Sequence, residues 1–337
     1  PNMVDVCFTR GGILKAEKNI TIQIKSNAIE AGNFKIFDGS GKITGFINIP
    51  NAVPEWWGLK PNTEEDASYY IQQAVDACSN VKISQGNFNI KTQINIPSGR
   101  TMQWDGSGFK TTIFHVFDKV TAFHFQFEEG MRDGCYLTIK NIMFIGNGVD
   151  SGSKAVYFHG IEKHAGNWLN MESCYFTGLS TCVDIGEAGQ CHFVANFALN
   201  NGTAYNLTRN ASFIYFERCM NLANVHFLWA DDEKADGISN GIFISETHSV
   251  CHKGTDVYIK GWQAVWIQQG GYDLGSGDEN SYAIHFKDCQ DMRISDVWIA
   301  SENINSPKRC GLFVEDTVKC SLANSSIVNH AVGVKIK

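Results

Sequence analysis

Two acidic residues, Asp184 and Glu217, belong to short segments of alternating apolar residues and are 33 positions apart (217 − 184). Hydrolysis of a glycosidic bond needs one carboxyl group to protonate the leaving oxygen and another to activate water or attack carbon, roughly 5 to 9.5 Å apart. If residue 217 lies one turn of a coil above residue 184, the two carboxylates are roughly 7 to 8 Å apart. We therefore predict Asp184 and Glu217 as a catalytic pair.

Three further acids are candidates for the same chemistry. Glu246 belongs to a set of acids at strand ends, where carboxylates commonly accept turn N–H bonds, and Thr247 and His248 follow it. Asp231 and Asp232 lie in an acidic insertion over residues 229–236. Charged loops are usually only solvated, but an acid on a loop that walls a groove can reach the substrate.

Aromatic residues recur at the middle, outward position of the short strands. One predicted column holds Asp184, Tyr215, Phe243, Trp266, His285 and Phe313, and a second holds Tyr175, His226, Tyr258 and Trp298 beside the loop at Trp229. Flat exposed rings pack well against the apolar faces of sugars. We predict Tyr215, Trp266, His285, Trp229, Tyr258 and Trp298 as substrate-binding residues. The alternative is that loops or a neighbouring subunit cover these rings.

The strands that carry these residues repeat. An apolar-x-apolar strand followed by a polar turn returns from about residue 136 onward, roughly every 18 to 31 residues, which is the range of stacked repeat folds. A β-sandwich also alternates, but it seldom returns the same strand and turn order over such a length. The pattern predicts an all-β, right-handed, single-stranded parallel β-helix, with rungs from about 81 to 337 and two explicit strands in each rung.

One helix precedes the rungs. Residues 63–78 place Ala67, Ile71, Ala74, Val75 and Cys78 on one apolar stripe. Thr63 is the predicted N-cap, with acids in the first turn. Residues 1–52 read as a small β-rich connector or cap, and residues 53–337 as the β-helix with its capping helix.

The composition limits the partners. The formal charge is −7, which gives no extended basic surface, so we expect no nucleic acid partner. No run of about 18 apolar residues occurs, so we expect no membrane insertion, and the N-terminal segment lacks the pattern of a secretory signal. The 11 cysteines form no CxxC pair and are expected to be free, with Cys191, Cys219, Cys251, Cys289 and Cys320 inside the coil. No cofactor or metal is expected, and the lone histidines His115, His124 and His159 are expected in the core or in turns.

Part of the chain resembles a known family. Residues 53–110 resemble the entry segment of pectate-lyase-like β-helices in Trp56-Trp57-Gly58-Leu59, Thr63-Glu64-Glu65-Asp66, Ile71-Gln72-Gln73-Ala74-Val75-Asp76-Ala77, Ile96-Pro97-Ser98-Gly99 and Trp104-Asp105-Gly106-Ser107-Gly108. In bacteriophage tailspikes and related polysaccharide depolymerases, this helix closes the N-terminal end of the coil. The residue sets of polygalacturonases and calcium-dependent pectate lyases are not found here, which disfavours a pectinase.

The resemblance implies a virion protein, made in the cytoplasm of the bacterial host. It implies a homotrimer that joins the phage tail or baseplate through its N-terminal part and binds a bacterial surface polysaccharide such as O-antigen or capsule. Residues 332–337 read as a strand with an open edge, so we expect association or a further C-terminal part to cover that edge.

Three activities remain open on this fold. Endo-hydrolysis by paired carboxylates is the favoured one. A lyase needs a base and a cation beside a uronic acid, for which His285, Lys287 and Arg218 are available. A non-catalytic glycan-binding or structural fibre module needs only the aromatic surface.

Overall fold

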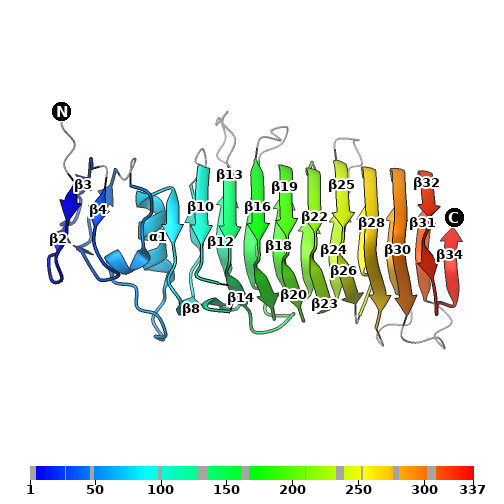
Figure 1. Cartoon of the computed structure of the whole chain (residues 1–337), viewed down its shortest axis with the longest axis horizontal. Coiled ribbons are helices and arrows are strands. Elements are labelled where there is room, and N and C mark those ends of the chain that lie inside the picture. The colour runs from blue at the N-terminus through cyan, green and yellow to red at the C-terminus, as the bar shows by residue number, and fades with distance from the viewer. Residues whose placement is uncertain are drawn as a thin grey trace.

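The computed structural model is a parallel β-helix in which the chain winds steadily from one end to the other (Figure 1). It describes residues 5–26, 28–45, 49–97, 101–108, 110–126, 136–160, 167–208, 210–232, 239–251, 253–275, 281–301 and 309–337. Each strand hydrogen-bonds in parallel to strands one turn before and after it, so residues distant in sequence become vertical neighbours. The predicted fold class is confirmed.

The coil has three strands in each turn, not two, and they form three faces. Face 1 contains β7 (Asn80–Lys82), β10 (Thr101–Asp105), β13 (Tyr136–Lys140), β16 (Trp168–Glu172), β19 (Gly189–Val194), β22 (Ser212–Glu217), β25 (Asn240–Ser245), the first halves of β28 (Gln263–Leu274) and β30 (Gln290–Ser301), and β32 (Val318–Ala323). Face 2 contains β8 (Gly86–Ile90), β11 (Thr112–Val116), β14 (Met143–Ile145), β17 (Tyr175–Thr177), β20 (Phe197–Leu199), β23 (Met220–Asn224), β26 (His248–Cys251), the second halves of β28 and β30, and β33 (Ser326–Ile327).

Face 3 is a separate sheet of 10 strands. It contains β9 (Ile94–Ile96), β12 (Thr121–Gln126), β15 (Lys154–His159), β18 (Thr181–Gly186), β21 (Thr203–Leu207), β24 (His226–Asp231), β27 (Val257–Lys260), β29 (Tyr282–Lys287), β31 (Cys310–Glu315) and β34 (Val332–Ile336). Faces 1 and 2 join into one sheet of 18 strands. All three kinds of strand share the apolar-x-apolar pattern, which is why the sequence did not separate them.

A repeated sharp corner joins face 1 to face 2. One residue in each turn has a positive φ there, between 49° and 59°: Asn141, Ser173, Ala195, Arg218, Glu246, Gln269, Asp296 and Asn324. This left-handed conformation bends the chain sharply from face 1 to face 2 within one residue. The outward residue just before each corner therefore lies on the rim of face 1, and Glu172 and Glu217 are two such residues.

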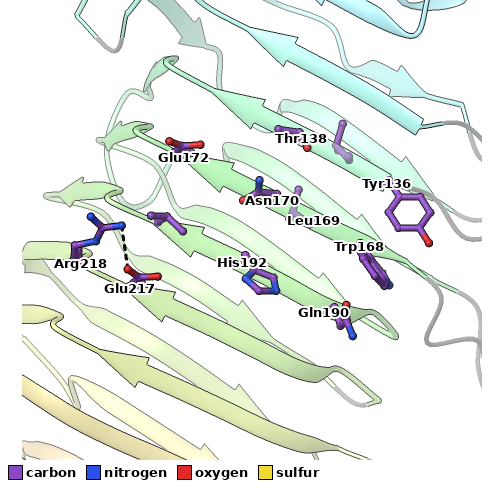
Figure 2. Close-up of a pocket in the computed structure, with 12 residues that line it drawn as sticks. Tyr136, Thr138, Trp168, Leu169, Asn170, Glu172, Gln190, His192, Glu217 and Arg218 are labelled. Atoms are coloured by element: carbon purple, nitrogen blue, oxygen red, sulfur yellow. Dashed lines mark ion pairs between the residues drawn. The ribbon is translucent and has the colours of Figure 1, made fainter.

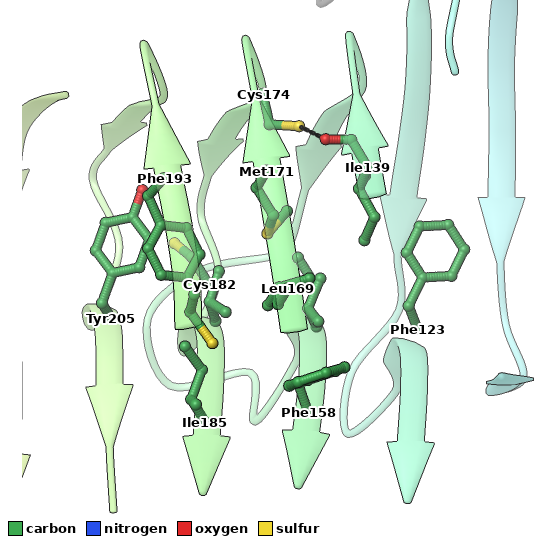
Figure 3. Close-up of a cluster of buried hydrophobic side chains, with 14 of the residues drawn as sticks. Phe123, Ile139, Phe158, Leu169, Met171, Cys174, Cys182, Ile185, Phe193 and Tyr205 are labelled. Carbon is green, nitrogen blue, oxygen red and sulfur yellow. Dashed lines mark hydrogen bonds between the residues drawn. The ribbon is translucent and has the colours of Figure 1, made fainter. Parts of the chain in front are cut away.

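Inward residues stack in columns and form a continuous core. In face 2, Phe88, Phe114, Phe144 and Phe176 lie one above another, with ring centroids 5.5 to 6.0 Å apart. Figure 3 shows the interior side chains Phe158, Leu169, Met171, Cys182 and Phe193. Burying one such phenylalanine contributes roughly 1.5 to 3 kcal/mol, so the core over many turns holds the coil together.

Buried asparagines satisfy the backbone at the turns. The Asn196 side chain accepts the Cys174 N–H (2.9 Å) and donates to the Met171 carbonyl (3.0 Å). Asn201 donates through Nδ2 to Oδ1 of Asn224 one turn further on (2.9 Å). These bonds join successive turns where the regular strand pairing stops.

The capping helix is shorter than predicted. Helix α1 covers Ser68–Ala77, and the predicted cap Thr63 instead donates its hydroxyl to the Lys60 carbonyl. Residues 61–65 before the helix form turns and bends, and Asp66 forms an isolated β-bridge with Asn89. The Asp66 carboxylate accepts the Ser68 N–H (3.0 Å). The predicted apolar stripe is confirmed, since all five of its residues are buried.

The N-terminal segment has the parallel pairing of the main coil. Its strands are β1 (Val6–Cys7), β2 (Leu14–Lys15), β3 (Thr21–Gln23), β4 (Ile29–Glu30), β5 (Phe37–Asp38) and β6 (Lys42–Thr44), followed by the 3-10 helix η1 (Pro54–Trp57). β1 pairs with β4, β2 with β5 and β3 with β6, all in parallel. The lead-in is therefore two small turns of three strands. Helix α1 lies between the lead-in and the coil (Figure 1), and it contacts β6 of the lead-in and β7 and β9 of the coil.

The described cysteines are free, as expected, and most are buried. The prediction that Cys320 packs inside the coil is wrong. Cys320 pairs with the buried Met292 but is exposed, because β32 lies on the last described turn and its inward side is open.

One buried acid makes the stability of the coil depend on pH. Asp256 is fully buried and accepts a hydrogen bond from the Ser249 hydroxyl (2.7 Å), and burial raises the pKa of its carboxyl group to about 7. The unfolded carboxyl group ionises near pH 4, so between about pH 4 and 7 the folded state binds more protons than the unfolded state. Stability from this group is therefore largest below pH 4 and falls as the pH rises through 7.

We predict that Asp256→Asn removes this dependence, because the amide keeps the acceptor for Ser249 without ionising. Urea unfolding at pH 5 and pH 8 measures it. Between pH 5 and pH 8, the free energy of unfolding of the wild type is expected to fall by on the order of a few kcal/mol more than that of the variant. Equal losses in both proteins contradict the prediction.

Candidate active site

The register of the strands separates the predicted catalytic pair. Asp184 lies on face 3, where its neighbours in the column are Tyr157 and Asn206. Glu217 lies at the end of β22 on face 1, between Val194 and Ser245. The prediction that the two acids share a column on adjacent rungs is wrong, because the segments that contain them belong to different strands of the turn.

Asp184 is held in a saturated network. Its side chain is 8% exposed and accepts hydrogen bonds from Lys154, from His159 (3.2 Å) and from Asn206 (2.9 Å). Burial raises the pKa of Asp184, but the bonds from His159, Lys154 and Asn206 outweigh it and hold the pKa at about 2. A carboxylate with three hydrogen-bond donors and little exposure is suited to holding the neighbouring side chains in place. His159 thus faces outward on a strand, and His124 stacks on Tyr157, so the prediction of core or turn positions is wrong for both.

Glu217 instead has a second carboxylate near it on face 1. Glu172 pairs with Val194, which pairs with Glu217, so the two acids share a column and are separated by one rung. Two strand spacings put their backbones roughly 9.5 Å apart. Each has one cation: Lys140 contacts Glu172 (2.5 Å) and Arg218 contacts Glu217 (3.0 Å).

These acids border a hollow of about 520 Å³ on face 1. Figure 2 shows Glu172, Glu217 and Arg218 at one end and the rings of Tyr136 and Trp168 at the other, with Thr138, Asn170 and His192 between them. Tyr136 and Trp168 pack edge to face, with centroids 4.7 Å apart, and are 41% and 39% exposed. The hollow therefore combines exposed ring surface, amide and hydroxyl groups, and two carboxylates.

His192 lies on the rung between the two acids. Its ring stacks on Tyr215 (4.5 Å), and partial burial lowers the pKa of His192, while the Glu217 carboxylate has the opposite effect. The pKa therefore favours a neutral imidazole at neutral pH, which can donate to or accept from a sugar hydroxyl.

The other predicted acids lie outside the hollow. Glu246 is exposed at a corner residue with φ 49°. Asp231 ends β24 on face 3 and pairs with Lys260 (3.2 Å), and Asp232 beside it is fully buried. The rest of the acidic insertion, 233–236, is outside the described residues. No finding tests a catalytic role for these three acids.

The six predicted substrate-binding residues divide among the three faces. Tyr215 and Trp266 lie on face 1, Trp298 lies on face 2, and Trp229, Tyr258 and His285 lie on face 3. Both predicted columns are therefore wrong as complete sets, although Tyr215, Phe243 and Trp266 do share a column on face 1 and each of the six residues points outward. The lyase set is divided too, because His285 and Lys287 are on face 3 and Arg218 is at the rim of face 1.

Ring orientation separates these aromatics further. Trp229 and Tyr258 stack with centroids 4.3 Å apart and planes 26° apart, so each covers a face of the other. Trp266 stands at 88° to Phe243 and is 39% exposed. A sugar stacks on a ring face, so a ring turned out of its stack offers more binding surface than a stacked one.

The sequence pattern did not single out four residues of the hollow: Glu172, Tyr136, Trp168 and His192. A signal for Glu172 was present: Glu172-Ser173-Cys174 and Glu217-Arg218-Cys219 repeat the same pattern, with the cysteine buried in each. In both segments, the positive-φ residue after the glutamate marks the same corner of the coil.

Within the described ranges, no group of three or more His, Cys, Asp or Glu side chains is arranged to hold a metal ion. None of the described helices has the length and apolarity needed to span a membrane.

Comparisons with known proteins find likeness in fold. No protein-family model and no curated protein sequence matches the chain. The enzymatically active domain of tailspike protein 2 of bacteriophage CBA120 matches with a TM-score of 0.58 and 10% identity, over 86% of this chain and 46% of that one. This chain thus spans about half the length of the tailspike domain.

Two other solved structures match less closely. The A-module of the mannuronan C-5 epimerase AlgE6 of Azotobacter vinelandii has a TM-score of 0.47 at 9% identity, over 85% of this chain and 99% of that one. The catalytic domain of a GH87 α-1,3-glucanase has a TM-score of 0.41 at 10% identity, over 82% and 67%. The resemblance to tailspike-type β-helices is confirmed for the fold alone.

We predict that Asp184→Asn lowers stability rather than turnover. The depressed pKa means that this carboxylate contributes stability above about pH 4, which is lost as the pH falls towards 2. The expected cost at pH 7 is roughly 2 to 3 kcal/mol, measured by urea unfolding. A folded variant that keeps wild-type stability but loses turnover shows instead that Asp184 takes part in the chemistry.

Proposed function

We propose that this protein is an endo-glycosidase that binds and cleaves a bacterial surface polysaccharide, such as O-antigen or capsule, in the hollow on face 1. The observation that carries the proposal is the pair Glu172 and Glu217, two carboxylates in one column beside an exposed aromatic pair. The fold likeness to a tailspike domain of bacteriophage CBA120 supports this choice of substrate class.

The spacing of the pair favours inversion at the anomeric carbon. Inverting enzymes keep their carboxyl groups roughly 6.5 to 9.5 Å apart so that a water molecule fits between base and sugar. The backbones of Glu172 and Glu217 are two strand spacings, roughly 9.5 Å, apart, and carboxyl groups with a similar separation fall at the upper end of this range. One carboxylate removes a proton from water as the water oxygen bonds to the anomeric carbon. The other carboxyl group protonates the leaving oxygen as the glycosidic bond breaks.

Substrate placement follows from the residues between the ends of the hollow. The Trp168 ring and its edge-to-face partner Tyr136 offer apolar surface to one sugar, about four residues along the strand from the carboxylates. That offset is roughly 13 Å, so substrate contacts at both ends need a chain of sugars rather than a single one. Thr138, Asn170 and His192 supply hydrogen-bonding groups between them.

We further propose that the protein assembles as a homotrimer and joins a phage virion through its N-terminal part. Face 2 supports self-association: from β14 to β26, its outward positions hold Met, Ile, Tyr, Thr, Phe, Leu, His and Val, and no Asp, Glu, Lys or Arg. A contiguous uncharged face on a coil whose other faces carry charges is a suitable contact between copies.

The central test replaces each carboxylate in turn. Glu172→Gln and Glu217→Gln are expected to lower turnover about 100- to 10,000-fold, because each removes a proton donor or acceptor. New reducing ends from candidate polysaccharides measure cleavage, and absorbance near 235 nm detects a lyase product. Glu64→Gln, an exposed glutamate before α1, is the matched control and keeps full turnover. Two folded variants with wild-type turnover exclude this pair.

Self-association is tested separately by placing a charge on face 2. Met220 is 42% exposed, so Met220→Glu has little effect on the isolated coil but buries a charge in the contact between copies. Light scattering after size exclusion is expected to give three chains for the wild type and one for the variant. Gln268→Glu, an exposed change on face 1, controls for added charge. A monomeric wild type overturns the trimer.

A further inference from the structure

The outward column through the hollow continues up face 1 beyond the carboxylates. His192, Tyr215, Phe243, Trp266 and Arg293 occupy the same position on five successive rungs. His192 is in the hollow, whereas the last three residues lie beyond it. The column therefore extends from the proposed cleavage site along the axis of the coil.

The rings of this column change orientation at Trp266. His192 and Tyr215 stack at 4.5 Å, and Tyr215 and Phe243 at 4.8 Å, with planes 21° and 13° apart. Trp266 breaks the series, since its plane is 88° from that of Phe243 at a centroid distance of 5.2 Å. With 39% of its surface exposed, Trp266 offers indole surface that the stacked rings below it do not.

Arg293 lies over the same indole. Its guanidinium carbon is 5.0 Å from the centre of the Trp266 ring, where the cation is attracted to the π-system and holds the ring in place. Its contacts to Asp291 are long, at 3.4 Å from both Nε and Nη2. The planar guanidinium has five N–H donors, so several remain for a ligand oxygen.

The neighbouring outward column on these rungs is polar and uncharged. It consists of Ser245, Gln268 and Ser295, each two positions after the aromatic or arginine residue on its strand. An exposed ring face beside hydroxyl and amide groups matches a sugar, which has an apolar ring face and a polar edge. An apolar protein partner would leave these polar groups without bonds.

We propose that Trp266 and Arg293 form a distal subsite that binds a further sugar ring of the polysaccharide, so that beyond the carboxylates the polymer runs along the coil axis. The sugar stacks on the Trp266 ring, and Arg293 donates to its oxygen substituents. Trp266 is two rungs beyond Glu217, roughly 9.5 Å along the axis. This subsite rests on the proposed function, which identifies the polymer, and it adds the direction in which the polymer runs beyond the carboxylates.

The test compares ligands of different length. The Glu172→Gln/Glu217→Gln double variant serves as the background, so that cleavage does not change the ligand. The ligands are the intact surface polysaccharide that the protein binds and size-fractionated oligosaccharides from its partial acid hydrolysis. Trp266→Ala is expected to weaken binding of the polysaccharide about three- to tenfold in calorimetric titration. The same substitution is expected to leave unchanged the affinity for the shortest oligosaccharide that the background protein binds, because that ligand does not reach the subsite.

The matched control is Phe117→Ala, which removes a ring of 38% exposure that also lies against a cation, Lys91, just after β11, and it is expected to bind both ligands like the background protein. Three results overturn the subsite: Trp266→Ala weakens binding of short and long ligands equally, it weakens neither, or Phe117→Ala weakens binding as much as Trp266→Ala does. Retained cleavage by both glutamine single variants rejects the proposed catalytic pair but leaves the length dependence as a test of the subsite. If the background protein binds no polysaccharide, both proposals fail.

Discussion

Parallel pairing of successive turns, residue over residue, is the constraint on which the rest of this structure depends. It places each inward side chain above its counterpart, so the column from Phe88 to Phe176 becomes part of a continuous core. It also gives outward residues neighbours that are far away in sequence. Glu172 and Glu217 share a column only because Val194 pairs with both.

Stacking in this way also requires sharp corners and leaves backbone groups to be satisfied where the strands end. In every turn of the coil the chain must bend sharply between faces 1 and 2, and the repeated positive-φ residue makes this bend. Where strand pairing stops, buried asparagines supply the missing bonds, as Asn196 does for the Cys174 N–H. Regular corners keep the outward columns of successive turns aligned.

Exposure and pairing distinguish the acids of this coil. Asp184 is 8% exposed and has three donors, which suits a residue that organises Lys154 and His159. Glu172 and Glu217 have 43% and 49% exposed side chains and one cation each, so a ligand can reach them. The outward aromatic rings also differ in how much of their faces is covered. Trp229 and Tyr258 cover one another, whereas Trp168 and Trp266 pack edge to face and stay open.

The sequence by itself determined the kind of fold and the direction of most side chains. Alternation with period two predicts which residues point inward, and the stripe on α1 predicts the helix face that is buried, because both follow from local geometry. The outward positions of Tyr215, Trp266 and Tyr258 were predicted in this way. Only the tertiary structure decided which outward residues meet. Three strands in each turn share one pattern, and turn lengths vary, so the sequence did not reveal that Asp184 belongs to face 3 and Glu217 to face 1. The pairing of rungs brings Glu217 to Glu172 because hydrogen bonding sets the vertical register, which local pattern does not encode.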